Sequence, residues 1–309
     1  MQQLSQEELG RKKRSGFEDK TLWDKLMLFG TVAIPLVVVG ATIAFSVVQF
    51  YLADQQHQSD QRLAQQQHVA DQQGALDQER ATILQTYLDN IQDLLLNHNL
   101  LGYSPKPKND ADKVTIQEVQ ELARARTLTA LQGLDPHRKG TLMQFLYEAK
   151  LIGYQDSKGK QQDPIITLLG ADLTHTDLTH ISLTGANLVG VTLTYAFLDG
   201  ANLSGANLTG ANLTNDTFVG ADLSGANLTD ANLTDTILTS ATLAGAFLTG
   251  ATLTSATFTN ATLGGTILDR ADLTGANITQ EQLNQTFSCL GIILLNGVKC
   301  PQHHRPRTT

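Results

Sequence analysis

The stretch ANLSGANLTGANLTNDTFVGADLSGANLTD, residues 201–230, decides the fold because one five-residue pattern runs through it without a break. A leucine or an equivalent apolar residue stands at every fifth position from Leu168 to Ile278, which makes 23 repeats in one register. On an α-helix, a step of five residues rotates the side chain by about 140° and scatters these residues around the axis. On a flat strand, an odd step sends successive leucines to opposite faces. The chain must therefore turn once per repeat, so that every leucine points to a common axis.

Two other positions of the repeat fit this interpretation. The residue two places before each leucine is usually alanine, which predicts a second, small inward-facing position. The residue two places after the leucine is usually glycine, with Asn215, Asp230, Asp235 and Asn260 among the exceptions, and these residue types suit a turn. Each repeat therefore supplies two inward positions and one corner.

The resulting motif, A-(D/N)-L-(S/T)-G, closely resembles the pentapeptide-repeat family, as in ANLSG at 201–205 and ADLSG at 221–225. The resemblance implies an all-β domain at residues 164–283, a right-handed quadrilateral β-helix with four repeats per coil and about six coils. Stacked coils leave two open ends that need covers. We expect the helix ending near Ile152, with residues 164–169, to cover the first end. A capping box at Thr279 and Gln282, with the apolar run Leu290, Ile292, Ile293, Leu294 and Leu295, is expected to cover the other.

A membrane span is predicted at residues 26–50. No charged residue occurs from Leu26 to Val48, and this apolar run is long enough to cross a bilayer, which takes about 20 residues. The basic residues Arg11, Lys12, Lys13, Arg14, Lys20 and Lys25 precede it, whereas Arg62 is the only basic residue among the 25 residues after Val48. By the positive-inside rule, we expect a single-pass plasma-membrane protein with residues 1–25 in the cytoplasm. Everything from about Tyr51 onward would then lie on the extracytoplasmic side.

Two helical segments are expected between the span and the repeats. Residues 51–104 form a Gln-rich stalk in which Leu84, Leu88, Ile91 and Leu95 share one helix face, and this face serves either packing within the chain or a short coiled coil. Residues 105–163 form an adaptor of two packed helices. The first begins at a capping box of Thr115 and Glu118, and the second begins at Asp135 and Pro136 and stops at Gly153. The order of span, Gln-rich stalk, adaptor and repeats also resembles a bacterial, membrane-anchored branch of the family.

Several apparent sites have simpler interpretations. His175 and His180 fall at adjacent corners without a third ligand for zinc. Cys289 with His303 or His304 lacks a third group that would orient a catalytic thiol, and Cys289 and Cys300 allow at most one disulfide, in residues 284–309, the C-terminal cap and tail. The cations Arg124, Arg126, Arg138 and Lys139 are interleaved with acids, which favours a solvated face over an anion site. A threonine column from Thr174 to Thr274 hints at ice binding, but the neighbouring outward column is irregular.

The composition favours a binding role over catalysis or nucleic-acid binding. Residues 168–283 hold ten acids and a single basic residue, Arg270, whereas a phosphate-binding surface needs clustered Lys and Arg. No enzyme signature, cofactor motif or small-molecule site emerges. We therefore predict a membrane-tethered, non-catalytic scaffold or protein-interaction module, with a protein partner or a homodimer contact. The alternative is an acidic DNA mimic that inhibits a nucleic-acid enzyme such as a topoisomerase, an activity that the family resemblance implies.

The candidate partner surface consists of outward positions that break the polar rule. Phe197, Val219 and Ile237 fall on one predicted face in successive coils, and Phe247 and Ile267 fall on the opposite face. Clustered exposed apolar residues often mark a contact site, although single ones are common on protein surfaces.

Overall fold

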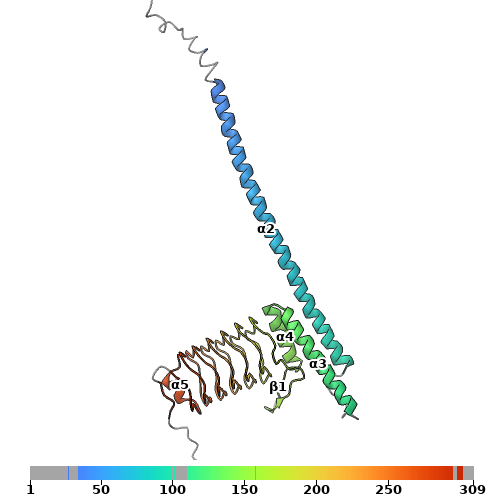
Figure 1. The fold of residues 1–309 in the computed structure, drawn as a ribbon, viewed down its shortest axis with the longest axis vertical. Helices are drawn as coiled ribbons and strands as arrows, with labels where there is room; N and C mark the ends of the chain where they lie inside the picture. Colours follow the sequence, from blue (N-terminus) through green and yellow to red (C-terminus); the bar gives the residue numbers. More distant parts are fainter. Residues whose placement is uncertain are drawn as a thin grey trace, which may run out of the picture. The chain divides into compact units, whose positions relative to one another are not determined.

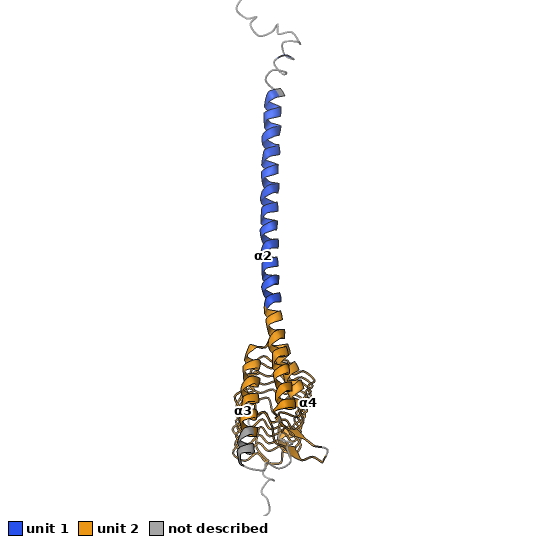
Figure 2. Cartoon of the chain, turned by 90° about the vertical axis from the view of Figure 1, so that its right-hand side faces the viewer, with its two compact units in different colours: residues 1–75 blue, residues 76–309 orange. Residues whose placement is uncertain are grey.

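The computed structural model describes residues 27, 34–98, 100–101, 110–156, 158–294 and 298–301. Its elements in chain order are α2 (Ile34–Asn97), α3 (Asp110–Gly133), α4 (Pro136–Glu148), β1 (Tyr154–Gln155), β2 (Gln161–Gln162) and α5 (Gln280–Asn284) (Figure 1). The chain divides into two compact units, Met1–Ala75 and Leu76–Thr309 (Figure 2). The predicted N-terminal segment 1–25 and part of the predicted span, residues 26 and 28–33, lie outside the described residues.

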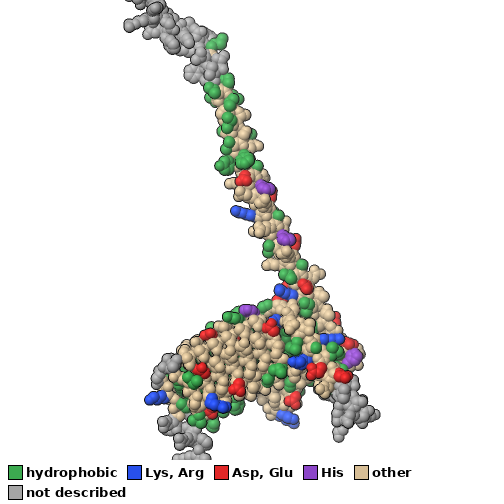
Figure 3. All heavy atoms as spheres, in the orientation of Figure 1, with side chains coloured by type: hydrophobic (Ala, Val, Ile, Leu, Met, Phe, Trp, Pro, Cys, Tyr) green, Lys and Arg blue, Asp and Glu red, His purple; other side chains and the backbone are tan. Residues whose placement is uncertain are grey.

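In the first unit, the described apolar residues of α2 are exposed, including Phe45 at 64% and Phe50 at 73%. By length and composition this helix could cross a membrane. The Gln-rich residues further along the same helix are exposed as well. The face of α2 seen in Figure 3 changes along the helix from hydrophobic to polar side chains.

The second unit contains a parallel β-helix whose bridges join residues 20 apart, such as Asn202 with Asp222 and Asn212 with Asn232. Every fifth residue from Gly170 to Gly275 has a positive φ, including non-glycine residues such as His175, Tyr195 and Arg270. Each leucine of the repeat is buried, as are the small residues two places before it. The predicted inward register and the corner at every repeat are therefore confirmed.

The (D/N)-L-(S/T) part of the motif has a hydrogen-bonding reason. The Asn227 side chain accepts hydrogen bonds from the backbone N–H and the hydroxyl of Thr229, and Asn202 with Ser204 and Asn232 with Thr234 do the same. Such local bonds satisfy backbone groups next to the corner and compete with other backbone conformations. They also occupy hydroxyls of the threonine column, since Thr214 and Thr274 donate to Asn212 and Asp272.

The adaptor caps the first coil through close backbone contacts. Asp135 caps α4 by accepting from the N–H groups of His137 and Arg138, as predicted. The Asp177 N–H donates to the Pro136 carbonyl, and a Cβ added at Gly140 would lie 2.1 Å from the Asp177 carbonyl oxygen. The Asn187 N–H donates to the Ile152 carbonyl, and both Ile152 and Ile166 are fully buried. These contacts hold α4 and the segment after it against the first coil, although the helix ends at Glu148 and not near Ile152.

Two expectations for the adaptor are corrected, and the structure adds to one that was open for the stalk. Thr115 lies inside α3, which begins at Asp110, so it does not start the helix. The stop of α4 is not Gly153 but Lys150, which has φ 57° and donates its N–H to Tyr147 while Leu151 donates to Leu146, a Schellman motif. The stripe of Leu84, Leu88, Ile91 and Leu95, for which packing within the chain and a coiled coil were both open, packs against the core of its own chain.

The C-terminal cover also differs from the prediction. The capping box of Thr279 and Gln282 is present, and the Gln282 amide donates to the carbonyls of Phe258 and Ala261 at the end of the last regular coil. However, Leu290 and Ile293 are 56% and 53% exposed, and Leu295 lies outside the described residues. Ile292 and Leu294 are partly buried against the core, as expected, and Leu283 and Cys289 are fully buried beside them in sequence. Bridges from Ile267 to Ser288 and from Asp272 to Ile293 carry the ladder past the predicted boundary at residue 283.

Candidate interaction surface

The first candidate surface is a set of neighbouring outward side chains on one face of the β-helix. Phe197 pairs with Thr217, and Thr217 pairs with Ile237, so Phe197 and Ile237 stand two coils apart in one column. Val219 lies two residues along from Thr217, and its backbone groups bond to Asp199 and Gly200 of the coil before. Phe197, Val219 and Ile237 are 49%, 41% and 40% exposed. The structure thus brings the three predicted residues together on one surface.

Tyr195 extends this surface and was not predicted. It occupies a corner position with φ 61°, where the repeat usually has glycine, and is 50% exposed beside Phe197. Its ring stacks on His175 of the preceding coil, with 5.3 Å between ring centroids and 17° between planes. The signal in the sequence was an aromatic residue at a corner position. We call Tyr195, Phe197, Val219 and Ile237 the apolar patch.

Carboxylates border the apolar patch. Asp177 pairs with Phe197 from the coil before, Asp199 lies two residues after Phe197, and Asp235 lies two residues before Ile237. Hydrogen bonds from the side chain and the backbone N–H of Thr179 hold the pKa of Asp177 below its ordinary value. The patch therefore combines apolar side chains with a negatively charged border.

The second candidate pair lies on another face, nearer the C-terminus. Phe247 pairs directly with Ile267. Phe247 is 45% exposed, and Ile267 is less exposed, since its side chain is half-buried. The N–H groups of Phe287 and Ser288 both donate to the Thr266 carbonyl, which marks an extra residue in the last coil. As a result Phe287 is 65% exposed beside this pair. The sequence did not predict Phe287 because the bulge shifts the register by one residue.

One inward position carries a carboxyl group. Asp216 stands where most repeats have alanine and is fully buried. Its Oδ1 accepts the Ala196 N–H at 2.8 Å, while its Oδ2 is buried without a hydrogen-bond partner. Burial raises the pKa of Asp216 to about 8, although the bond from Ala196 acts in the opposite direction. The protonated form therefore prevails in the folded protein at neutral pH.

The remaining sequence candidates serve as structural contacts. The His175 ring stacks on Tyr195, and the His180 ring covers Gly200 of the next coil, where an added Cβ would lie 2.3 Å from Nδ1. Arg138 forms ion pairs with Asp77 of α2 and with the cap residue Asp135, at 2.8 and 2.7 Å.

The other adaptor cations also differ from the expected solvated face. Arg124 donates to the Leu169 carbonyl at 3.1 Å, and the Lys139 side chain, only 8% exposed, lies 3.9 Å from Asp172. Arg126 is half-buried. Arg124 and Lys139 thus join the adaptor to the first coil, and Arg138 joins α4 to α2.

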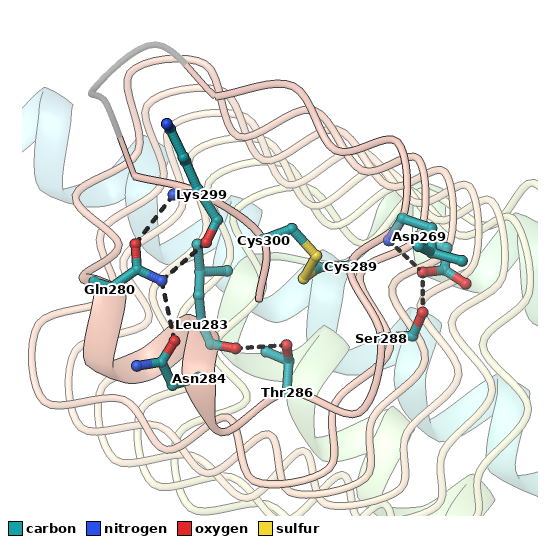
Figure 4. The surroundings of a disulfide bond; sticks show 10 residues. Asp269, Gln280, Leu283, Asn284, Thr286, Ser288, Cys289, Lys299 and Cys300 are labelled. Atoms are coloured by element: carbon teal, nitrogen blue, oxygen red, sulfur yellow. Dashed lines mark hydrogen bonds between the residues drawn. A yellow bond between two sulfur atoms is a disulfide. The ribbon is translucent and has the colours of Figure 1, made fainter. Parts of the chain in front are cut away.

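Cys289 and Cys300 form a disulfide (Figure 4). Cys289 is fully buried below Leu268, where the bulge has placed it in the inward column. The Gln280 side chain donates to the Lys299 carbonyl and accepts the Lys299 N–H, so the tail is held at two points across the last coil. Cys289 has no free thiol for catalysis, and His303 and His304 lie outside the described residues.

Comparison with known proteins agrees with this geometry. The family described as pentapeptide repeats matches in eight copies, over residues 168–205, 186–215, 218–254 and 253–286. No curated protein sequence matches the chain. Among solved structures, a pentapeptide repeat protein from the Arabidopsis thaliana thylakoid lumen is 28% identical, with 35% of this chain and 72% of that one covered and a TM-score of 0.22.

Two cyanobacterial structures are similar as well. The pentapeptide repeat protein Rfr23 from Cyanothece 51142 is 25% identical, with 47% of this chain and 79% of that one covered and a TM-score of 0.23. One from Nostoc Pcc 7120 is 29% identical, with 41% and 86% covered and a TM-score of 0.17. The uninterrupted repeat register, the corner at every fifth residue and the eight matched copies together show that residues 168–286 are a repeat domain of the pentapeptide-repeat family, folded as a right-handed β-helix.

Proposed function

We propose that this chain is a membrane-tethered, non-catalytic interaction module that presents a four-sided β-helix of about six coils outside the cytoplasm. The observation that carries the proposal is the apolar patch, in which four apolar side chains, each 40–50% exposed, lie together on an otherwise polar repeat. Contiguous exposed apolar surface on a soluble domain often marks a contact site. Because β-helix coils are joined by a continuous backbone ladder, the side chains are held at fixed spacing.

The tether is supported by three independent features. The described apolar part of α2 is long enough to span a bilayer and is exposed along its length. The basic residues before it and their scarcity after it favour a cytoplasmic N-terminus. The Cys289–Cys300 disulfide fits an oxidising compartment, since disulfides are rare in the cytosol. We assign this arrangement to a bacterial, membrane-anchored branch of the family.

The alternative function, an acidic inhibitor of a nucleic-acid enzyme, receives less support. DNA mimicry needs rows of ionised carboxylates facing one partner, at about one charge per 1.7 Å of helix axis. Of the acids in the repeat, Asp216 points into the core, and Asp177, Asp222 and Asp230 lie on different faces or corners. An extracytoplasmic domain would also be separated from DNA enzymes.

Photo-crosslinking from the apolar patch tests the proposal. Benzoylphenylalanine is placed at Val219 in the full-length protein in its own membranes, and the matched control carries it at Thr242, in a column outside both candidate surfaces. We expect a crosslinked product from Val219 only, and its loss in the Phe197→Ser, Ile237→Thr double variant, which restores ordinary repeat residues. The same products with and without these changes would show that the patch is only surface.

A further inference from the structure

We propose that the apolar patch binds a basic amphipathic helix of a partner protein, rather than a second copy of this chain. This inference rests on the proposed function and adds the chemistry of the partner. It is carried by the spacing of the apolar side chains and by the charges around them.

The spacing fits two turns of a helix. Phe197 and Ile237 are two coils apart, which corresponds to about 9.6 Å at the usual separation of neighbouring strands. Val219 lies between them, displaced by two residues along the chain, and the three make a triangle. On an α-helix, residues i and i+7 are about 10.5 Å apart, with i+3 and i+4 between them on the same face. Side chains of such a face would meet Phe197, Val219 and Ile237 in turn, as in helix-binding grooves.

The charge around the patch has one sign. Residues 171–250 contain seven Asp and no Lys or Arg. Asp177 and Asp235 are exposed and Asp199 is half-buried, and all three border the patch. Asp177 stays ionised because Thr179 bonds to its carboxylate, and Asp199 is fixed by the Val219 N–H at 2.8 Å. Lys or Arg beside the apolar face of the partner would complement this border.

The same border disfavours self-association. In a two-fold dimer each patch would face its own copy, because such an interface uses the same surface on both subunits. Asp177, Asp199 and Asp235 would then lie near the same three carboxylates of the second chain. Like charges placed together across an interface cost several kcal/mol and reject that partner.

The experiment uses full-length protein in nanodiscs of zwitterionic lipid and two fluorescent 18-residue peptides. One peptide has leucines at helical spacing with lysines elsewhere, and the second replaces every lysine with glutamate. Fluorescence anisotropy is measured, and binding to empty nanodiscs is subtracted. We expect the Leu/Lys peptide to bind and the Leu/Glu peptide not to bind.

Two double variants separate the apolar and charged contributions. Phe197→Ser with Ile237→Thr removes the apolar contacts, and Asp177→Asn with Asp199→Asn removes the charges while keeping the oxygens that accept hydrogen bonds. We expect each pair to weaken binding of the Leu/Lys peptide at least tenfold, with unchanged circular dichroism. Equal affinity for the two peptides, or an affinity for the Leu/Lys peptide that the Asp→Asn changes leave unaltered, would overturn the inference.

The crosslink from Val219 separates this inference from the proposed function. A patch-dependent product that is a dimer of this chain, or that comes from an acidic segment, would refute the basic partner and leave the interaction role intact. Absence of any patch-dependent product would refute the interaction role itself.

Discussion

Asp216 is a residue that departs from the repeat and lowers the stability of the folded state. Ala196 and Ala256, at equivalent inward positions of other coils, bury only a methyl group, whereas Asp216 buries a carboxyl with one oxygen unbonded. Threonines at equivalent positions avoid this cost, because Thr236 donates its hydroxyl to the Leu233 carbonyl at 2.7 Å. Asp216 has a donor for one oxygen only, so ionisation in the folded state is unfavourable.

We therefore predict that Asp216→Ala stabilises the protein and that the gain depends on pH. The pKa of Asp216 is raised from 3.8 to about 8 by burial, so folding favours the protonated form. Stability is highest below about pH 4 and falls as the pH rises towards about 8, where the folded state also loses the proton. The increase in Tm on Asp216→Ala should be larger at pH 8 than at pH 5, by an amount that corresponds to a few kcal/mol.

The control for this prediction is Asp222→Asn, an outward carboxylate in the next repeat. It should give no pH-dependent gain in Tm. An equal change in Tm at both pH values for Asp216→Ala would show that the carboxyl group is not held in its neutral form.

The inward or corner position of each residue was predictable from the sequence wherever the repeat is regular. Inward leucines and alanines and the corner positions followed from the period of five. The role of Tyr195 did not, because an aromatic residue at a left-handed corner gives no sign that its ring will stack on His175 of the preceding coil. That contact forms because corners 20 residues apart stack on one another in successive coils. The pattern within a single repeat does not indicate which corner side chains will be neighbours.

At the scale of elements, the junction between α4 and the first coil depends on one glycine. The Cα of Gly140 faces the Asp177 carbonyl so closely that a Cβ at this position would lie 2.1 Å from the oxygen. The same element contributes the Pro136 carbonyl that accepts the Asp177 N–H. A larger residue at Gly140 would therefore push α4 away from the edge that it covers.

We predict that Gly140→Ala destabilises the protein by about 1–3 kcal/mol, the usual cost of overpacking, despite the better helix propensity of alanine. The matched control is Gly74→Ala in α2, where a Cβ meets nothing within 4 Å and should add up to about 1 kcal/mol of helix stability. Chemical unfolding monitored by circular dichroism measures both. Equal and favourable effects of the two substitutions would contradict the close packing of α4 on the first coil.

Element boundaries were harder to predict than element types. The sequence placed the start of the second adaptor helix at Asp135 because an N-cap followed by proline is a local signal. It misplaced the start of α3, since Thr115 and Glu118 match the capping-box pattern inside a longer helix. It also left open whether Leu84, Leu88, Ile91 and Leu95 pack within the chain. That choice depends on α3, whose position relative to α2 no local pattern encodes.

At the scale of the whole molecule, the topology decides which partners are accessible. A cysteine introduced by Gln58→Cys should react with a membrane-impermeant thiol reagent in intact cells, and one introduced by Ser5→Cys should not. The basic residues before the apolar segment give this orientation. The experiment uses a background in which Cys289 and Cys300 are replaced by serine. The opposite labelling pattern would place the β-helix in the cytoplasm and reopen the role of a topoisomerase inhibitor.

The disulfide links topology to stability, because disulfides form and persist in oxidising compartments and are rare in the cytosol. It joins residues 11 positions apart and holds the tail across the last coil, where Cys289 is fully buried. Closing a loop of this length stabilises the folded state by roughly 3 kcal/mol in the chain-entropy account. Gln280 holds Lys299 independently, so reduction should loosen the tail without unfolding the coils before it.

We therefore expect the purified full-length protein to lose stability when treated with a strong reductant, and hydrogen exchange to rise first in residues 280–301. The Cys289→Ala, Cys300→Ala variant should show the same rapid exchange with or without reductant. Protein extracted from cells under alkylating conditions should carry no free thiol, since both cysteines are paired. The prediction would be contradicted if both cysteines in that extract were alkylated and the stability of the protein were the same with and without reductant. Neither a disulfide that holds the C-terminal tail nor an extracytoplasmic position of the domain would agree with that result.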